Sequence, residues 1–156
     1  MSIPSQTHHL YSMNIVDDYS SFVWTIPLHS KDEAALALKS WLPTLEVQTP
    51  YCLQSFVTDN GELVLSQIHL WCTQKGILYL LTTPYTSAHN GHTEHLHRTL
   101  FNKSRGMLSA CQAPANLWDE FCVTTAYLTN LTGTSANNRK TPYKLWHNHK
   151  PSVSHL

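Results

Sequence analysis

The sequence is poor in permanent charge. Only 13% of its 156 residues are Asp, Glu, Lys or Arg, and 10 basic residues balance 10 acidic ones. Nucleic-acid binding that rests on bulk positive charge is therefore excluded at neutral pH. Because 42% of the residues are apolar, the chain does not have the composition of a disordered protein either. What it has instead is histidine, whose 11 residues outnumber Lys and Arg combined.

Long apolar runs and paired cysteines are also lacking. No apolar run exceeds a few residues, so no membrane span is expected, and MSIPSQTHHL lacks the basic start and apolar stretch of a signal peptide. The cysteines are widely spaced and form no CxxC pair, which argues against a zinc ribbon or a thioredoxin motif. We expect four reduced, mostly buried thiols: Cys52, Cys72, Cys111 and Cys122. The length fits one domain.

Apolar patterning predicts the order β-β-α-β-α-β-α-α, which is an α/β protein with a mixed sheet. Residues 10–16 and 22–28 flank DDYSS and predict a hairpin. Residues 30–33 form a capping box before a helix, in which Pro43 predicts a kink or an early end near Leu42. The other expected elements are strands at 53–58 and 77–82, helices at 65–75 and about 91–111, a helix opened by Pro114, and a short helix at 142–146.

Apolar residues at helical spacing predict which side of each long helix is buried. In the first helix they are Ala34, Leu38, Trp41 and Leu45. In the helix at 91–111 they are Leu96, Leu100, Met107 and Cys111. In the helix after Pro114 they are Leu117, Phe121, Thr125 and Leu128.

Two carboxylates stand at positions suited to metal chemistry. Asp59 follows a predicted strand, where α/β folds place their sites, and Glu94 lies in the first turn of a long helix. Such a pair can meet at one Mg²⁺, although two-metal phosphoryl chemistry needs more than two carboxylates. Equally, Asp59 can belong to a turn and Glu94 can be a favourable charge at a helix N-terminus.

One face of the same helix carries basic residues. Glu94, Arg98, Phe101 and Arg105 follow each other at spacings of four, three and four, so they share a face. Arg98 and Arg105 beside a metal-binding carboxylate could hold DNA phosphates; the alternative is two solvated arginines. Lys103 points elsewhere and is expected to be plain surface.

Histidines crowd around Glu94. His92 and His95 are one turn apart, so a Zn²⁺ or Ni²⁺ site is conceivable. No cysteine or carboxylate completes a recognisable signature. Solvated or pH-responsive histidines are the alternative.

A series of motifs runs through the chain in a fixed order: VDDYSSFVW, SKDEA, TDNGEL, PYTSAHNGHTEHLHRTL, LW-E, A-YL-N, TPYKLWH and KPSVSHL. This series closely resembles the integrase core of Copia-type LTR retrotransposons. The resemblance implies an RNase H-like, retroviral integrase-type fold of three layers with a mixed sheet over residues 1–134, followed by a polar extension with a short helix at 135–156. It also implies Mg²⁺- or Mn²⁺-dependent joining of element DNA to target DNA.

The resemblance assigns roles by residue. Asp59 matches the second aspartate of the D-D-E metal triad and Glu94 the glutamate, so both would be catalytic and metal-binding. By the same resemblance, the DNA-binding residues are Asn90, Gly91, Arg98 and Arg105. The implied partners are element ends, target DNA and further copies of the chain. Location stays open: intracellular, and nuclear if the protein functions.

The first triad aspartate and its central strand have no counterpart here. Met1 lies in what resembles the loop after that strand, and Asp17 and Asp18 match a different position. We therefore expect a gapped sheet, or two fragments tied mainly by helices, and no catalysis by this chain alone. Whether the chain is an enzyme stays open; the alternative is a non-catalytic nucleic-acid-binding or interaction remnant.

Histidine tends to replace arginine where the chain departs from similar integrases. His29, His92 and His95 stand where basic residues are usual. One hypothesis is drift through CGY-to-CAY codon transitions. A neutral imidazole cannot grip phosphate as arginine does, so DNA binding should strengthen below about pH 6, where histidines recharge.

Overall fold

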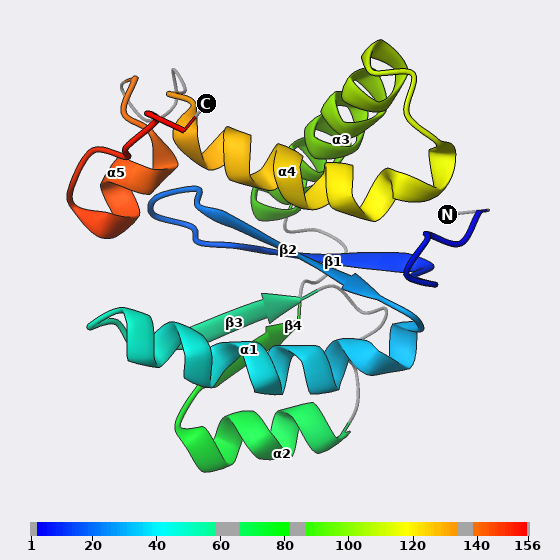
Figure 1. Cartoon of the computed structure of the whole chain (residues 1–156). Coiled ribbons are helices and arrows are strands. Elements are labelled where there is room, and N and C mark those ends of the chain that lie inside the picture. Colours follow the sequence, from blue (N-terminus) through cyan, green and yellow to red (C-terminus); the bar gives the residue numbers. More distant parts are fainter. Residues whose placement is uncertain (1–2, 59–65, 82–86, 134–138, 156) are drawn as a thin grey trace. The chain divides into compact units, whose positions relative to one another are not determined.

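The structure is a computed structural model that describes residues 3–58, 66–81, 87–133 and 139–155, without the side chains of 48, 66–67 and 87–93. The element order matches the sequence prediction (Figure 1). The elements are β1 Tyr11–Val16, β2 Val23–Leu28, α1 Ala34–Gln48, β3 Ser55–Thr58, α2 Ser66–Lys75, β4 Leu78–Leu81, α3 Ser87–Ala110, α4 Trp118–Leu131 and α5 Pro142–His147, with 3-10 turns η1 Lys31–Glu33 and η2 Ala115–Leu117.

The chain forms two compact units. The split unit combines Met1–Pro27 with Thr93–Leu156, and the inserted unit is Leu28–His92. Each contains one pair of strands: β1 with β2, and β3 with β4 in parallel, Ser55 opposite Leu78. The described strands form two separate two-stranded sheets, in line with the expectation of a gapped sheet or of two fragments.

The loop of the first hairpin is shaped by Asp17. Its carboxylate accepts hydrogen bonds from the backbone N–H of Ser20 at 2.7 Å and from the Ser20 hydroxyl at 2.6 Å. Ser21 takes up the left-handed conformation, with φ of 57°. Because the loop is short, β1 and β2 must run antiparallel. Asp17 thus stabilises the hairpin loop.

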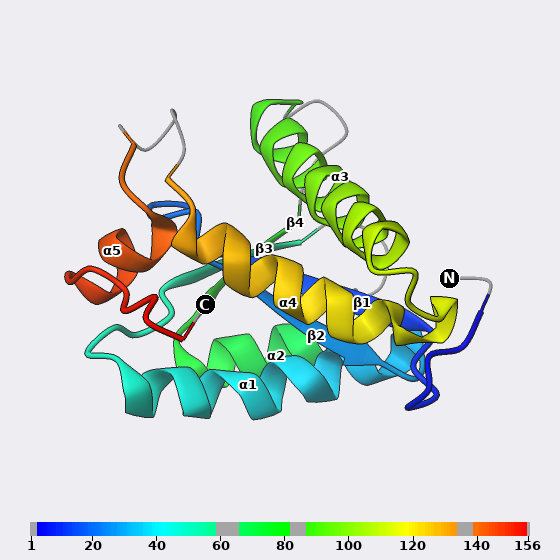
Figure 2. The ribbon, with the colours of Figure 1, turned by 45° about the horizontal axis from the view of Figure 1, so that its top comes forward.

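Helices α3 and α4 cover this hairpin (Figures 1 and 2). The centre of the core is a cluster of Val23, Leu100 and Ala126, with Val16 and Leu96 packed against it. Burying such side chains is the main favourable contribution to folding. The core therefore joins strands near the N-terminus to helices from the second half of the sequence.

The predicted buried face of α4 was wrong by about one position. Leu117 ends the 3-10 turn η2, so it does not share the helical phase that starts at Trp118. Phe121 and Leu128 are only half-buried, and Cys111 lies exposed beyond the end of α3. The buried residues of α4 are Trp118, Asp119, Cys122, Thr125, Ala126, Thr129 and Asn130.

Asn130 fastens the end of α4 to β2. Its side-chain Nδ2 donates to the Val23 carbonyl at 2.8 Å, and its Oδ1 accepts from the Val23 N–H at 2.9 Å. Both residues are buried. The amide therefore pairs with the strand as a neighbouring strand would, and it satisfies two backbone groups that water cannot reach.

The short helix α5 is also joined to the hairpin. Thr141 caps it by accepting from the Lys144 N–H at 3.0 Å, and Pro142 at the first turn suits its fixed φ. Trp146 packs edge-on against Trp24 with ring centroids 5.1 Å apart, and its centroid lies 6.0 Å from that of Phe22. The predicted helix at 142–146 is confirmed.

In the inserted unit α1 and α2 lie side by side (Figures 1 and 2). The buried apolar residues of the two helices are Ala34, Ala35, Leu38, Leu42, Leu45, Ile68 and Cys72. The Cys72 thiol is buried, and its desolvation raises its pKa. The four cysteines are free as expected, although Cys52 and Cys111 are exposed rather than buried.

Two local expectations for α1 need correction. The helix does not end near Leu42 but continues through Pro43 to Gln48, because Leu42 and Leu45 are both held in the core. The expected capping box is not formed in the predicted way either. The Ser30 hydroxyl makes no cap hydrogen bond; instead the Glu33 carboxylate accepts from the His29 N–H at 2.9 Å.

Candidate nucleic-acid and metal site

Helix α3 positions most of the residues that the sequence singled out. It begins at Ser87, earlier than the predicted start near Gly91, and ends at Ala110. Leu96 and Leu100 face the core. That packing fixes the rotation of the helix, so the polar residues on its other faces are directed outward.

Glu94, Arg98 and Arg105 are all exposed, and Phe101 between them is half-buried. Their helical spacing places them along one face, as predicted. Arg105 donates to the Asn102 side-chain oxygen at 2.9 Å. Among the described residues no ion pair engages Glu94 or Arg98. This face therefore offers one carboxylate and two guanidinium groups to solvent.

Asp59 lies outside the described residues. It comes directly after Thr58, the last residue of β3, where the sequence placed it. Asn90 and Gly91 lie in the first turns of α3, although the Asn90 side chain is not described. The predicted meeting of Asp59 and Glu94 thus stays a prediction.

The histidines near Glu94 differ in their surroundings. His95 and His97 are both exposed, and the His97 ring lies edge-on to that of Phe101 with 4.6 Å between the ring centroids. Desolvation lowers the pKa of His97, because the charged imidazolium is less well solvated there. His92 has no described side chain. No group of three potential metal ligands occurs among the described His, Cys, Asp and Glu residues.

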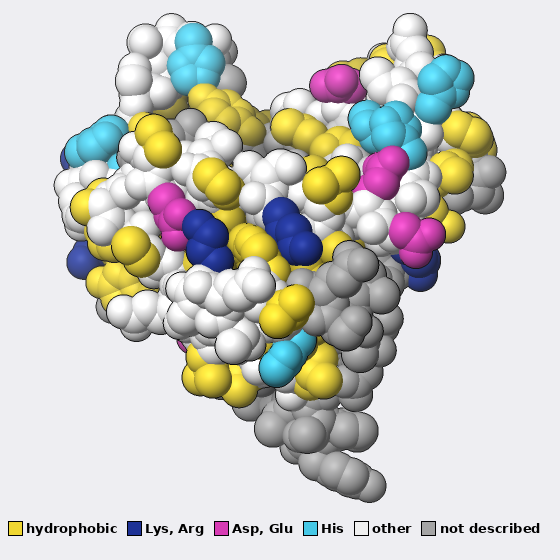
Figure 3. Space-filling model, turned by 90° about the horizontal axis from the view of Figure 1, so that it is seen from below, with side chains coloured by type: hydrophobic (Ala, Val, Ile, Leu, Met, Phe, Trp, Pro, Cys, Tyr) yellow, Lys and Arg dark blue, Asp and Glu magenta, His cyan; other side chains and the backbone are white. Residues whose placement is uncertain are grey.

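Positive charge does not gather on the face shown in Figure 3. The described Lys and Arg side chains are scattered there, and some of them lie beside Asp or Glu side chains. No continuous basic patch is visible on that face, in line with a zero net charge. This face therefore offers no broad cationic surface.

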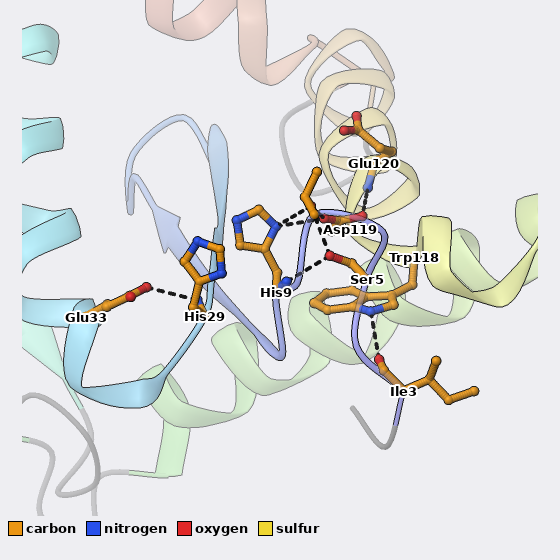
Figure 4. Close-up of polar contacts among 9 residues, drawn as sticks. Ile3, Ser5, His9, His29, Glu33, Trp118, Asp119 and Glu120 are labelled. Atoms are coloured by element: carbon orange, nitrogen blue, oxygen red, sulfur yellow. Dashed lines mark hydrogen bonds and ion pairs between the residues drawn. The ribbon is translucent and has the colours of Figure 1, made fainter.

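A second polar cluster was not expected from the sequence (Figure 4). Asp119, at the start of α4, accepts from the Thr7 hydroxyl at 2.6 Å and pairs with His9 Nδ1 at 2.8 Å. Burial alone would raise the pKa of Asp119, but hydrogen bonds from Thr7, His9, Ser5 and the Glu120 N–H outweigh it and lower the pKa to about 2. Asp119 therefore remains charged although it is buried.

The same cluster ties the N-terminal segment to α4. The Trp118 indole N–H donates to the Ile3 carbonyl at 3.1 Å (Figure 4), and the Gln6 N–H donates to the Asn116 carbonyl at 2.7 Å. In the sequence, the sign of this cluster is an aspartate next to a tryptophan in the apolar stripe of a helix. The cluster's arrangement is structural, since it satisfies the buried Asp119.

Comparison with solved structures defines the class of fold. The chain resembles a chain of the simian T-cell lymphotropic virus intasome in complex with PP2A regulatory subunit B56 gamma, with a TM-score of 0.67 and 18% identity over 92% of this chain and 54% of that one. It also resembles the HTLV-2 integrase catalytic core domain in complex with magnesium, with a TM-score of 0.64 and 15% identity over 88% and 93%. The fold is that of retroviral integrase catalytic cores, an RNase H-like fold.

Sequence comparison then shows the family. The profile of the integrase core domain matches residues 1–87, which is more than half of the chain. The chain belongs to the integrase core domain family. Glu94 and the arginines of α3 lie beyond that match but within the alignments to the relatives described next.

Three relatives are plant retrotransposon polyproteins. The Pol polyprotein from transposon TNT 1-94 of Nicotiana tabacum is 31% identical over the whole chain. Those from transposons RE1 and RE2 of Arabidopsis thaliana are 26% and 24% identical over 99% of it. The chain spans only 10–12% of these polyproteins. No helix in the described ranges is long and apolar enough to cross a membrane.

Proposed function

We propose that this chain derives from a retrotransposon integrase that joins element DNA to target DNA by two-metal phosphoryl transfer. The observation that carries the proposal is the exposed face of α3, where Glu94, Arg98 and Arg105 follow one another in a chain of the integrase core family. In this proposal residues 1–134 form the core and 135–156 a polar extension. Its partners are DNA and further copies of itself.

The metal would be Mg²⁺ or Mn²⁺, held by Asp59 and Glu94. The donor set supports this, because carboxylate oxygens are the ligands that Mg²⁺ prefers. The exposed Glu94 carboxylate has no ion-pair partner among the described residues. An integrase core of similar fold was determined with magnesium. A metal pair could activate the attacking oxygen and stabilise the leaving one.

Two carboxylates are too few to hold two metal ions. Residues 1–156 offer no match to the first triad aspartate, and Asp17 is already occupied in the hairpin loop. We therefore propose that this chain alone does not catalyse strand transfer. A non-catalytic nucleic-acid-binding remnant is the second candidate function, and the exposed arginines of α3 support it equally well.

Strand-transfer assays separate the two candidates. The chain alone should give no joined product with Mg²⁺, whereas a chain extended by an upstream Asp-bearing strand should join oligonucleotide ends. Asp59→Asn and Glu94→Gln should each abolish that activity. Glu120→Gln, which changes an exposed carboxylate on α4, should leave it intact.

Two outcomes would contradict parts of this proposal. If the chain alone joins DNA ends and Asp59→Asn abolishes the joining, the inactive interpretation is wrong. If the extended chain binds DNA but never joins it, the remnant interpretation holds.

DNA binding rests on Asn90, Gly91, Arg98 and Arg105 in this proposal. Arg98→Gln and Arg105→Gln should each weaken binding and reduce the slope of log K against log salt by about one. Arg139→Gln removes an exposed arginine outside α3 and serves as the matched control. Equal effects in all three variants would remove the special role of α3.

Binding should also strengthen on acidification, as His29, His92 and His95 gain charge. His97 should gain charge at a lower pH than an ordinary histidine, because desolvation lowers its pKa. A binding curve that is flat between about pH 5 and 8 would contradict the histidine hypothesis.

A further inference from the structure

Two histidines lie close together at the C-terminal end of α5. His147 is the last residue of this helix and is half-buried, and His149 follows two positions later and is exposed. Their ring centroids are 5.7 Å apart. Both residues belong to the split unit, and the proposed function uses neither of them.

The end of the helix at Asn148 explains why the two rings are neighbours. Side chains two positions apart point to different sides of a continuous helix. Asn148 has the left-handed conformation, with φ of 59°, which asparagine tolerates better than most residues do. This conformation ends the helical path after His147, so the His149 ring can approach the His147 ring.

The His149 ring is held by a hydrogen bond to the main chain. Its Nδ1 lies 3.1 Å from the Lys150 carbonyl oxygen. A carbonyl oxygen only accepts, so the neutral imidazole carries its hydrogen on Nδ1 and keeps a lone pair on Nε2. Histidines that bind metal ions almost always donate their other ring N–H in this way, which fixes the tautomer. His149 therefore has Nε2 as its ligand atom.

The His147 ring is held by aromatic packing. The Tyr143 ring lies 4.3 Å away between centroids, at 41° to the imidazole plane. The Phe22 ring of the hairpin meets the same imidazole edge-on at 5.8 Å. A ring packed on two sides loses less conformational freedom when it binds an ion, so its contacts favour binding.

We propose that His147 and His149 together bind one late first-row divalent cation, Ni²⁺, Cu²⁺ or Zn²⁺, for which imidazole is a suitable ligand. Metal–nitrogen distances of about 2.0–2.1 Å put the ion about 3.2 Å from each ring centroid, so two rings on one ion lie roughly 5–6 Å apart. The observed separation of 5.7 Å falls in this range. No third His, Cys, Asp or Glu joins them in the described part of the chain, so water completes the coordination.

This site is independent of the proposed function. The ion proposed at Asp59 and Glu94 is one that prefers oxygen ligands, whereas the pair on α5 offers two nitrogens. An excess of Mg²⁺ should therefore not displace Ni²⁺ from His147 and His149. Loss of either proposal leaves the other standing.

The test is a calorimetric titration of the whole chain with Ni²⁺ in excess Mg²⁺, at about pH 7.5, where ordinary imidazoles are mostly neutral. His147→Phe keeps an aromatic ring in the packing but removes one ligand, and His149→Gln removes the other. Each variant should weaken Ni²⁺ binding by at least about tenfold, since losing even an outer-shell partner can cost that much.

Three control variants locate the ion. His69→Gln removes an exposed histidine of the inserted unit, and His95→Gln removes one from the exposed side of α3. Lys150→Gln changes the side chain but keeps the carbonyl that holds His149. None of the three should weaken Ni²⁺ binding. Thermal melts of all variants establish that they are folded.

Several results would overturn this assignment. Unchanged Ni²⁺ affinity in a folded His147→Phe or His149→Gln variant would show that the two imidazoles do not share an ion. Loss of binding in His95→Gln alone would place the ion on α3. Displacement by Mg²⁺ would indicate a carboxylate site. Lack of saturable binding by the parent up to about 1 mM Ni²⁺ would exclude any useful affinity.

Discussion

The split unit and the inserted unit differ in the bonds that tie their segments together. In the split unit, hydrogen bonds join residues more than a hundred positions apart: Asn130 with Val23, Asp119 with His9, and Trp118 with Ile3. In the inserted unit, hydroxyl groups on or next to the helices make local hydrogen bonds. They run from Ser40, Thr44, Thr49 and Thr73 to carbonyls four residues earlier.

The strands of the two units also differ in how deeply their side chains are buried. In β2, Val23 and Leu28 are buried and the residues between them are half-buried. In the parallel pair of the inserted unit, Val57, Leu78, Leu80 and Leu81 are 43–59% exposed. The inserted unit thus depends on the apolar packing of its helices, and we expect it to open before the split unit does.

Leu38→Ala should have the largest effect and should separate the units. Leu38 is fully buried in the inserted unit, and removing its side chain should cost about 3–4 kcal/mol. Residue-resolved hydrogen exchange should show faster exchange in α1 and α2 and little change in α4. The control is Leu36→Ala on the same helix, where the side chain is 67% exposed. Equal loss of protection in both units would show that they unfold as one.

Asn130→Ala should instead destabilise the split unit. It leaves the Val23 N–H and carbonyl without partners at 1% exposure, so it should cost about 2–3 kcal/mol. Urea denaturation would measure the loss, and exchange of the Val23 amide should accelerate. Asn102→Ala, which breaks only an exposed bond to Arg105, should be nearly neutral. A similar loss from both would remove the special role of Asn130.

Acid should weaken the split unit through Asp119. Its pKa is about 2 when folded and 3.8 in the reference state, so its contribution is present above about pH 4 and is lost as the pH falls towards 2. The difference amounts to about 2 kcal/mol. Unfolding free energies at pH 6 and pH 2 should show this loss in the parent, and Asp119→Asn should lack it. Identical pH profiles would contradict the assignment.

Glu46→Gln should have the smallest effect. The carboxylate lies 3.9 Å from Lys75 Nζ, and both side chains are partly exposed. Pairs of this kind typically contribute about 0.2–1 kcal/mol. A loss above about 1 kcal/mol in urea denaturation would mean that a polar contact does stabilise the inserted unit.

The sequence predicted local structure well, because apolar periodicity and turn residues act over short distances. The hairpin around DDYSS, the order of the elements and the separation of the strands into two pairs are examples. It failed where a residue's role depends on a distant partner. Asn130 and Asp119 are polar residues in an apolar stripe, and nothing in the sequence identifies Val23 or Thr7 as their partners.

The candidate site could be predicted only in part. Helical spacing placed Glu94, Arg98 and Arg105 on one exposed face, and the structure agrees. Spacing says nothing of whether Asp59 approaches Glu94, since that depends on how a strand end and a helix are brought together. A hollow between α3 and α4 beside Gly106 was not predicted either. A glycine inside a helix is a visible signal, but the space beside it exists only once α4 is in place.

The interruption of the split unit by the inserted one has a consequence for the order of folding during synthesis. A ribosome releases β1 and β2 first, yet their partner Asn130 emerges only after the whole of Leu28–His92. The inserted unit is one continuous stretch of sequence and can form while translation continues. The hairpin must wait, because closing so long a loop is entropically unfavourable until the helices arrive. During that interval Val23 and its neighbours remain unprotected, and a chaperone or a nascent neighbouring chain could bind them.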